Sequence, residues 1–101
     1  MHIISKKPLQ EFWKIHADAE TPLTHWFKIV SKTDFKNFNA LRKTFSSADV
    51  VGKCVIFNIG GNKYRLITVI HFNRRTVYIR DVLTHDEYNR RKWNECTNPH
   101  H

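Results

Sequence analysis

Two adjacent glycines separate a pair of apolar runs in the second half of the chain. The run VVGKCVIFNI (50–59) precedes Gly60-Gly61, and KYRLITVIHF (63–72) follows. Both runs are short and rich in β-branched and aromatic residues, which favours strands over helices. Glycine adopts a positive φ without steric cost, as a tight hairpin turn requires. These residues therefore predict an antiparallel hairpin to which the remaining elements must be added.

The hairpin extends at its C-terminal side into a three-stranded meander. A turn at residues 73–75 leads to TVYIRDVL (76–83), which has the composition of a last strand. The segment THDEYNRRKW (84–93) then predicts a short helix. Near the start of the chain, the β-branched segment His2–Ser5 predicts one more strand.

Two amphipathic helices are predicted in the first half of the chain. Apolar and aromatic residues recur at helical spacing behind Pro8, and again behind Thr21-Pro22, which carries a helix-start signal. The two stripes are Leu9, Phe12, Trp13 and His16, then Leu23, Trp26, Phe27 and Val30. We interpret both stripes as core. Residues 31–49 fit either a third short helix or an ordered connection.

The predicted fold class is α+β, with a twisted antiparallel sheet, two N-terminal helices on one face and a short C-terminal helix. The 101 residues suit one domain spanning 1–101, with a disordered tail at about 94–101. Seventeen Lys and Arg against nine Asp and Glu give a net charge of +8. This excess suits a polyanion such as nucleic acid, although a solvated basic surface or an acidic partner would also explain it.

Several function classes find no support in the sequence. No apolar run approaches the roughly 20 residues of a membrane span, and the start lacks the features of a signal peptide. Cys54 and Cys96 form neither a zinc pattern nor a convincing disulfide framework, and the seven histidines show no metal-site spacing. We expect a reduced, cytoplasmic protein that uses no metal and no cofactor.

The strand after the glycine turn carries positive charge where burial would be expected. Side chains alternate between faces, so Tyr64 and Leu66 point one way while Lys63 and Arg65 point the other. The basic residues therefore gather at the glycine end of one face. A solvated face would distribute them more evenly.

The segment THDEY supports a structural and a chemical interpretation. Thr84 and Glu87 have the spacing of a capping box, which explains both residues without a functional role. His85 and Tyr88 are three residues apart and hence neighbours on a helix. With Arg65 as a phosphate-binding cation, they could cleave RNA through its own 2′-hydroxyl. Taken alone, the pair fits packing equally well.

The motifs NxGGNxxR, ending at Arg65, and THxEY, about twenty residues later, resemble those of HigB-type toxins. These toxins belong to type II toxin–antitoxin modules, within the RelE-like family of mRNA interferases. The resemblance extends over nearly the whole chain. It implies a RelE-like fold and a metal-independent endoribonuclease that cuts mRNA, typically on the translating ribosome. It also implies neutralisation by a cognate helix-turn-helix antitoxin.

The resemblance assigns catalysis to Arg65, in its YRL context, and to His85 and Tyr88. The expected RNA-binding residues are Lys53, Asn62, Lys63, Arg74 and Arg80. Structural explanations stay open for Asn62 in the turn, for Arg80 in an ion pair, and for Lys53 and Arg74 as solvated charge. The chain lacks the long basic C-terminal helix motif of better-known relatives, which leaves open whether His85 or Tyr88 is the base. Two rival interpretations remain. The protein could be a non-catalytic RNA- or ribosome-binding module, or a regulator that binds only its antitoxin.

Overall fold

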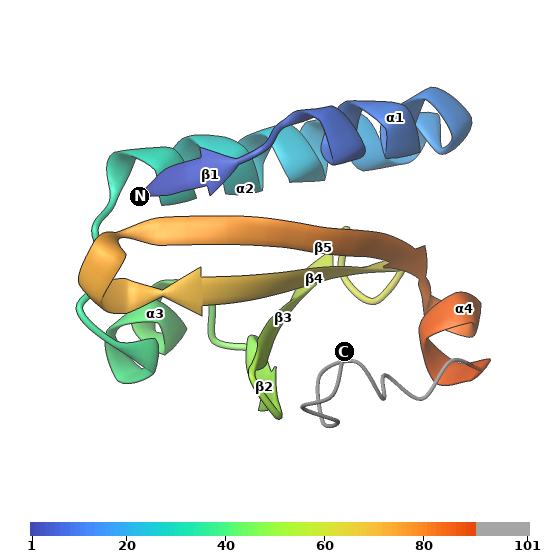
Figure 1. Cartoon of the computed structure of the whole chain (residues 1–101). Coiled ribbons are helices and arrows are strands. Elements are labelled where there is room, and N and C mark those ends of the chain that lie inside the picture. Colours follow the sequence, from blue (N-terminus) through green and yellow to red (C-terminus); the bar gives the residue numbers. More distant parts are fainter. Residues whose placement is uncertain (91–101) are drawn as a thin grey trace.

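Five strands form a single sheet in the computed structural model, which describes residues 1–90 (Figure 1). The strand order is β1-β5-β4-β3-β2. The bounds are His2–Ile4 for β1, Asp49–Val51 for β2, Cys54–Ile59 for β3, Tyr64–His71 for β4 and Thr76–Thr84 for β5. Strands β3, β4 and β5 pair antiparallel, as predicted, and β2 adds a further antiparallel pairing with β3. Strand β1 pairs parallel with β5, so the sheet is mixed, which corrects the purely antiparallel expectation. The long excursion between β1 and β5 permits the parallel pairing.

The predicted glycine hairpin is confirmed, with φ of 61° at Gly60 and 70° at Gly61. The run 50–59, by contrast, is two strands. Gly52 has a φ of 58° and turns the chain between β2 and β3. Strand β3 itself is buried on both faces, because nearly all its side chains have little exposure.

Four α-helices accompany the sheet within residues 1–90. They are α1 (Lys7–Ile15), α2 (Glu20–Lys32), α3 (Phe38–Thr44) and α4 (His85–Arg90). Helices α1 and α2 lie together over one side of the sheet, as predicted (Figure 1). Helix α2 begins at Glu20 after a short 3-10 turn, so Thr21 is not its cap and Pro22 lies within its first turn. Of the two interpretations of residues 31–49, a third short helix or an ordered connection, the structure shows the helix, α3.

The main core lies between the sheet and helices α1 and α2. Phe57 of β3 makes edge-to-face contacts with Trp26, at 5.3 Å between ring centroids, and with Phe45, at 5.1 Å. Leu66 of β4 belongs to this core, whereas Ile67 belongs to a second cluster on the other face. The predicted alternation along β4 is therefore confirmed.

The second cluster consists of Cys54, Ile56, Ile67 and Leu83, against which Tyr88 packs. Cys54 is disulfide-bonded, so the expectation of reduced cysteines is wrong. Spacing along the chain does not measure spatial separation, which is why the sequence could not predict the bond. The predicted tail at 94–101 and the end of the helix predicted at 84–93 lie outside the described residues. No helix within residues 1–90 is long and apolar enough to cross a membrane.

The predicted capping box at the start of α4 is confirmed. The Thr84 backbone N–H donates to Glu87 Oε1 at 2.9 Å, and the Glu87 N–H donates to Thr84 Oγ1 at 3.1 Å. The two bonds satisfy amide groups that a short helix would otherwise leave without intrahelical partners. They fix the direction in which the chain leaves β5.

Replacing Thr84 with Ala should lower the free energy of unfolding by about 1 kcal/mol, because one cap acceptor is lost. Thr84→Ser keeps the hydroxyl and should behave like the parent. Urea denaturation of the three proteins measures the difference. A Thr84→Ala protein as stable as the parent would contradict the role of the cap.

Candidate active site at the glycine end of the sheet

Arg65 of β4 lies on the sheet face opposite α1 and α2 and is half-buried. Its Nη2 lies 3.0 Å from His85 Nδ1. A guanidinium has only donors, so Nδ1 must accept this hydrogen bond. The neutral His85 ring therefore carries its proton on Nε2.

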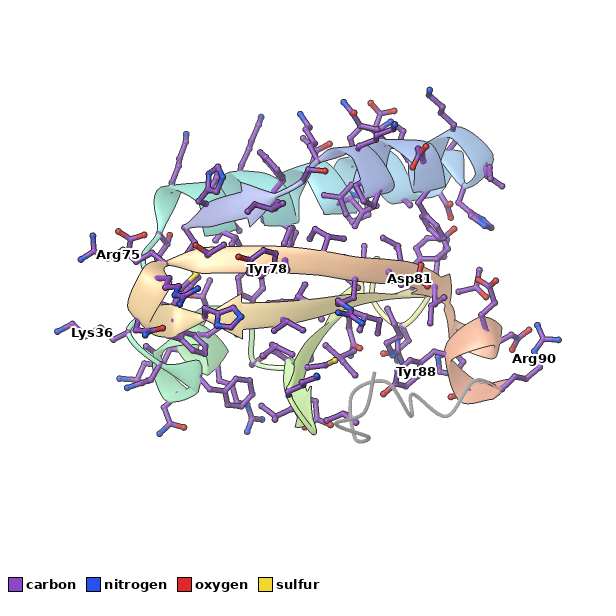
Figure 2. The ribbon with its side chains drawn as sticks, viewed as in Figure 1. Lys36, Arg75, Tyr78, Asp81, Tyr88 and Arg90 are labelled. Atoms are coloured by element: carbon purple, nitrogen blue, oxygen red, sulfur yellow. The ribbon has the colours of Figure 1, made fainter. Side chains whose placement is uncertain are left out.

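Two backbone carbonyls and one aromatic ring hold the guanidinium in place. Nη1 of Arg65 lies 3.2 Å from the Asn62 carbonyl oxygen and 3.3 Å from that of Tyr64, and it donates to both. The guanidinium carbon lies 5.7 Å from the centroid of the Tyr88 ring, within cation–π range. In Figure 2, Tyr88 points from α4 back beneath the sheet, whereas Arg90 points away from it.

Strand pairing brings these residues together across a long sequence separation. Arg65 pairs with Leu83, and Tyr64 pairs with Thr84. The ladder continues one residue further, because the His85 backbone N–H donates to the Lys63 carbonyl at 2.9 Å. The first residue of α4 is thus tied to the end of the glycine turn. The structure brings together all three residues expected to be catalytic.

Lys63 has a different position from the one predicted. It lies in the turn before β4, and its Nζ is 3.2 Å from Asp18 Oδ2. The Tyr64 hydroxyl also donates to Asp18, and Tyr64 belongs to the helix-side core. The ammonium therefore lies beside Tyr64 rather than on the face of Arg65, so the predicted shared face is wrong. The strand alternation does not hold in the turn.

The contacts around Asp18 shift the pKa values of Asp18 and Tyr64 in opposite directions. Hydrogen bonds from Tyr64 and Lys63 lower the pKa of the Asp18 carboxyl below its usual value, since both stabilise the carboxylate. The same bond raises the pKa of the Tyr64 phenol, because ionised Tyr64 could not donate to a carboxylate. Asp18 thus ties the turn between α1 and α2 to the glycine turn.

The other residues expected to bind RNA do not all lie in one place. Asn62 is exposed in the glycine turn, where its carbonyl accepts from Arg65. Lys53 is exposed in the turn between β2 and β3, and Arg74 in the turn between β4 and β5. Arg80 is exposed on β5 where the register with β4 shifts. Lys53, Arg74 and Arg80 therefore lie apart from the Arg65–His85 contact.

Asp18 is the residue of this region that sequence reasoning missed. It lies more than forty residues before its partners, and no local pattern distinguishes it from other acidic residues. Its place between two predicted helices is the only signal. Across residues 1–90, no group of three or more His, Cys, Asp or Glu side chains is placed to hold a metal ion.

A cationic, imidazole- and phenol-bearing site on the face of a small α+β domain is suited to binding and reacting with a phosphodiester. The family model for HigB toxin, described as the RelE-like toxic component of a toxin–antitoxin system, matches residues 19–91. The chain belongs to this family of toxins.

Named relatives agree with the family. The mRNA interferase toxin HigB of Escherichia coli strain K12 is 33% identical over 91 residues, which cover 87% of this chain and 88% of the relative. The mRNA interferase HigB of Shigella flexneri has the same identity and coverage. That of Escherichia coli O6:H1 is 28% identical over 93 residues, or 89% of this chain and 90% of the relative.

The Asp18 contacts predict a pH dependence of stability. A carboxyl whose pKa is lower in the folded protein contributes stability above its unfolded value of 3.8, and this contribution is lost as pH falls through the folded pKa. Asp18→Asn should therefore melt at a lower temperature than the parent at neutral pH. The difference in melting temperature between the parent and Asp18→Asn should shrink below pH 3.8.

Thermal melting at a series of pH values provides the measurement. A gap between the parent and Asp18→Asn that stays constant down to strongly acidic pH would contradict the assigned contacts.

Proposed function

We propose that this toxin-family protein is an endoribonuclease that cleaves mRNA and thereby arrests translation and growth. The contact between Arg65 Nη2 and His85 Nδ1, with Tyr88 beneath the guanidinium, carries the proposal. Membership of a toxin family, relatives named mRNA interferases and a net charge of +8 support it.

The chemistry requires no group outside the chain and its substrate. The 2′-oxygen of one nucleotide attacks the adjacent phosphorus, and the bond from phosphorus to the 5′-oxygen breaks. The products are a 2′,3′-cyclic phosphate and a 5′-hydroxyl. A base must take the 2′-proton, an acid must protonate the leaving oxygen, and a cation must stabilise charge on the phosphoryl oxygens.

We assign these three roles to the three clustered residues. Arg65 binds the phosphate, because its planar fork matches two phosphoryl oxygens and it cannot lose its charge. When Arg65 turns its donors to the phosphate, His85 Nδ1 is released from its hydrogen bond and can accept the 2′-proton. Tyr88, on the adjacent turn of α4, then donates to the leaving oxygen. A free imidazole nitrogen is a far better base than a phenol at neutral pH.

The proposal includes partners and a place of action. A cognate antitoxin of the helix-turn-helix type would neutralise the protein, and the translating ribosome would present the mRNA. The cytoplasm is where both are found. The remaining exposed cations, including Lys53 and Arg74, would contact phosphates away from the scissile bond.

Arg65→Ala and His85→Ala should each reduce RNA cleavage by about 10²–10⁴-fold, because each removes one group that stabilises the transition state or transfers a proton in it. Both proteins should remain folded and still bind the antitoxin. His25→Ala, on the exposed side of α2, is the matched control and should cleave like the parent. Growth arrest and primer-extension mapping of transcripts after brief induction provide the measurement.

Two outcomes would overturn the assignment. Full toxicity of Arg65→Ala and His85→Ala would show that other residues perform the chemistry. Growth arrest by the parent with intact transcripts would favour a non-catalytic RNA- or ribosome-binding module. Melting temperatures of all variants separate a loss of chemistry from a loss of folding.

A further inference from the structure

A groove lies at the opposite end of β4 from the Arg65–His85 contact. It has a volume of about 790 Å³ and is lined by residues of β1, the start of α1, β4, β5 and the turn before β3. This volume is within the range of small-ligand sites, which is roughly 300–1,000 Å³. Lys53, Val69, His71 and Tyr78 are the lining residues that matter below.

The groove contains a perpendicular aromatic pair that is at least partly exposed. The His71 and Tyr78 rings lie 5.5 Å apart at an interplanar angle of 88°. In a perpendicular pair, the faces of the ring that presents its edge are not covered by its partner. His71 is exposed and Tyr78 is partly exposed, so a planar ligand can reach them. Val69 pairs with Tyr78 in the strand register and adds an apolar surface.

The charge of the groove favours an anionic ligand. Lys53 is exposed at its rim, and none of the described residues that line it is an Asp or Glu. A planar apolar group attached to a negative charge satisfies both features, and this is the chemistry of a nucleotide. An apolar peptide would not need the cation, and an acidic peptide would not need the open rings.

The side of the groove that carries His71 and Val69 lies on the same face of the sheet as the proposed chemical centre. Arg65, Val69 and His71 alternate onto the same side of β4, opposite the helices. Val69 is four positions after Arg65, which corresponds to about 13 Å along a strand. Figure 2 shows Tyr78 toward the Arg75 end of β5, with Tyr88 beneath the other end of the sheet. A single-stranded RNA a few nucleotides long can span both places.

We propose that this groove binds one unpaired nucleobase of the RNA, stacked on the Tyr78 ring with its edge beside His71, and an adjacent phosphate at Lys53. The inference rests on the proposed function, since it locates a second contact of the same substrate. It adds a base-binding subsite distant from the scissile bond, which would hold the RNA in register with Arg65.

The test measures binding of a fluorescent single-stranded 2′-O-methyl oligoribonucleotide, which cannot be cleaved because its 2′-oxygens are blocked. At low salt, Tyr78→Ala should weaken binding by about ten-fold or more, the order of effect seen when a stacking ring is removed. Tyr78→Phe keeps the ring and should bind like the parent. His71→Ala should weaken binding less, and His25→Ala on α2 should have no effect.

A second measurement identifies the contact as base stacking. Oligonucleotides with a single abasic site are compared at each position in turn. With the parent, one position should lose affinity when its base is removed. With Tyr78→Ala, that position should lose its effect, because both changes remove the same contact. If the melting temperature of Tyr78→Ala lies below the temperature of the assay, His71→Ala provides the same comparison.

Unchanged RNA affinity for both Tyr78→Ala and His71→Ala would overturn the inference. So would a loss of antitoxin binding with RNA affinity retained, which would assign the groove to a protein partner. The proposed function is tested separately by transcript cleavage. If the parent cleaves RNA and these variants bind it normally, only the subsite is refuted. If the parent binds RNA without cleaving it, the subsite can still be confirmed by the abasic series.

Discussion

The hydrogen bond from the His85 backbone N–H to the Lys63 carbonyl, at 2.9 Å, extends the pairing of β4 and β5 into α4. The site depends on this contact. It places the first residue of α4 beside the strand that carries Arg65, although His85 lies twenty positions later in the sequence. The capping box at Thr84 and Glu87 then directs the helix so that His85 and Tyr88 both reach the guanidinium.

Charge at this end of the sheet is divided between two faces. Asp18 binds the Lys63 ammonium and the Tyr64 hydroxyl on the helix side. Arg65 lies on the other face, where its partners are backbone carbonyls, an imidazole and an aromatic ring. None of these partners is a carboxylate. The guanidinium therefore keeps its full charge available for a phosphate, while the neighbouring lysine helps to fix the turn.

Much of the fold follows from local patterns. The hairpin at Gly60-Gly61, the meander, the two N-terminal helices and the capping box are each encoded within a few residues. Three features are not encoded locally: the parallel pairing of β1 with β5, the turn at Gly52 and the disulfide bond of Cys54. Each depends on distant chain segments or on one glycine within a strand-like run. The site follows the same rule. Arg65, His85 and Tyr88 were predicted from motifs, whereas Asp18 and the pairing of His71 with Tyr78 depend on tertiary packing.

The central claim is that Arg65 and His85 direct the RNA 2′-hydroxyl against the adjacent phosphate. The chemical ends of the cleaved RNA test it most directly. Mass spectrometry of fragments produced by the parent, and absent with His85→Ala, should find a 2′,3′-cyclic phosphate on one fragment and a 5′-hydroxyl on the other. Fragments with a 3′-hydroxyl and a 5′-phosphate would contradict the account, because they require attack by water.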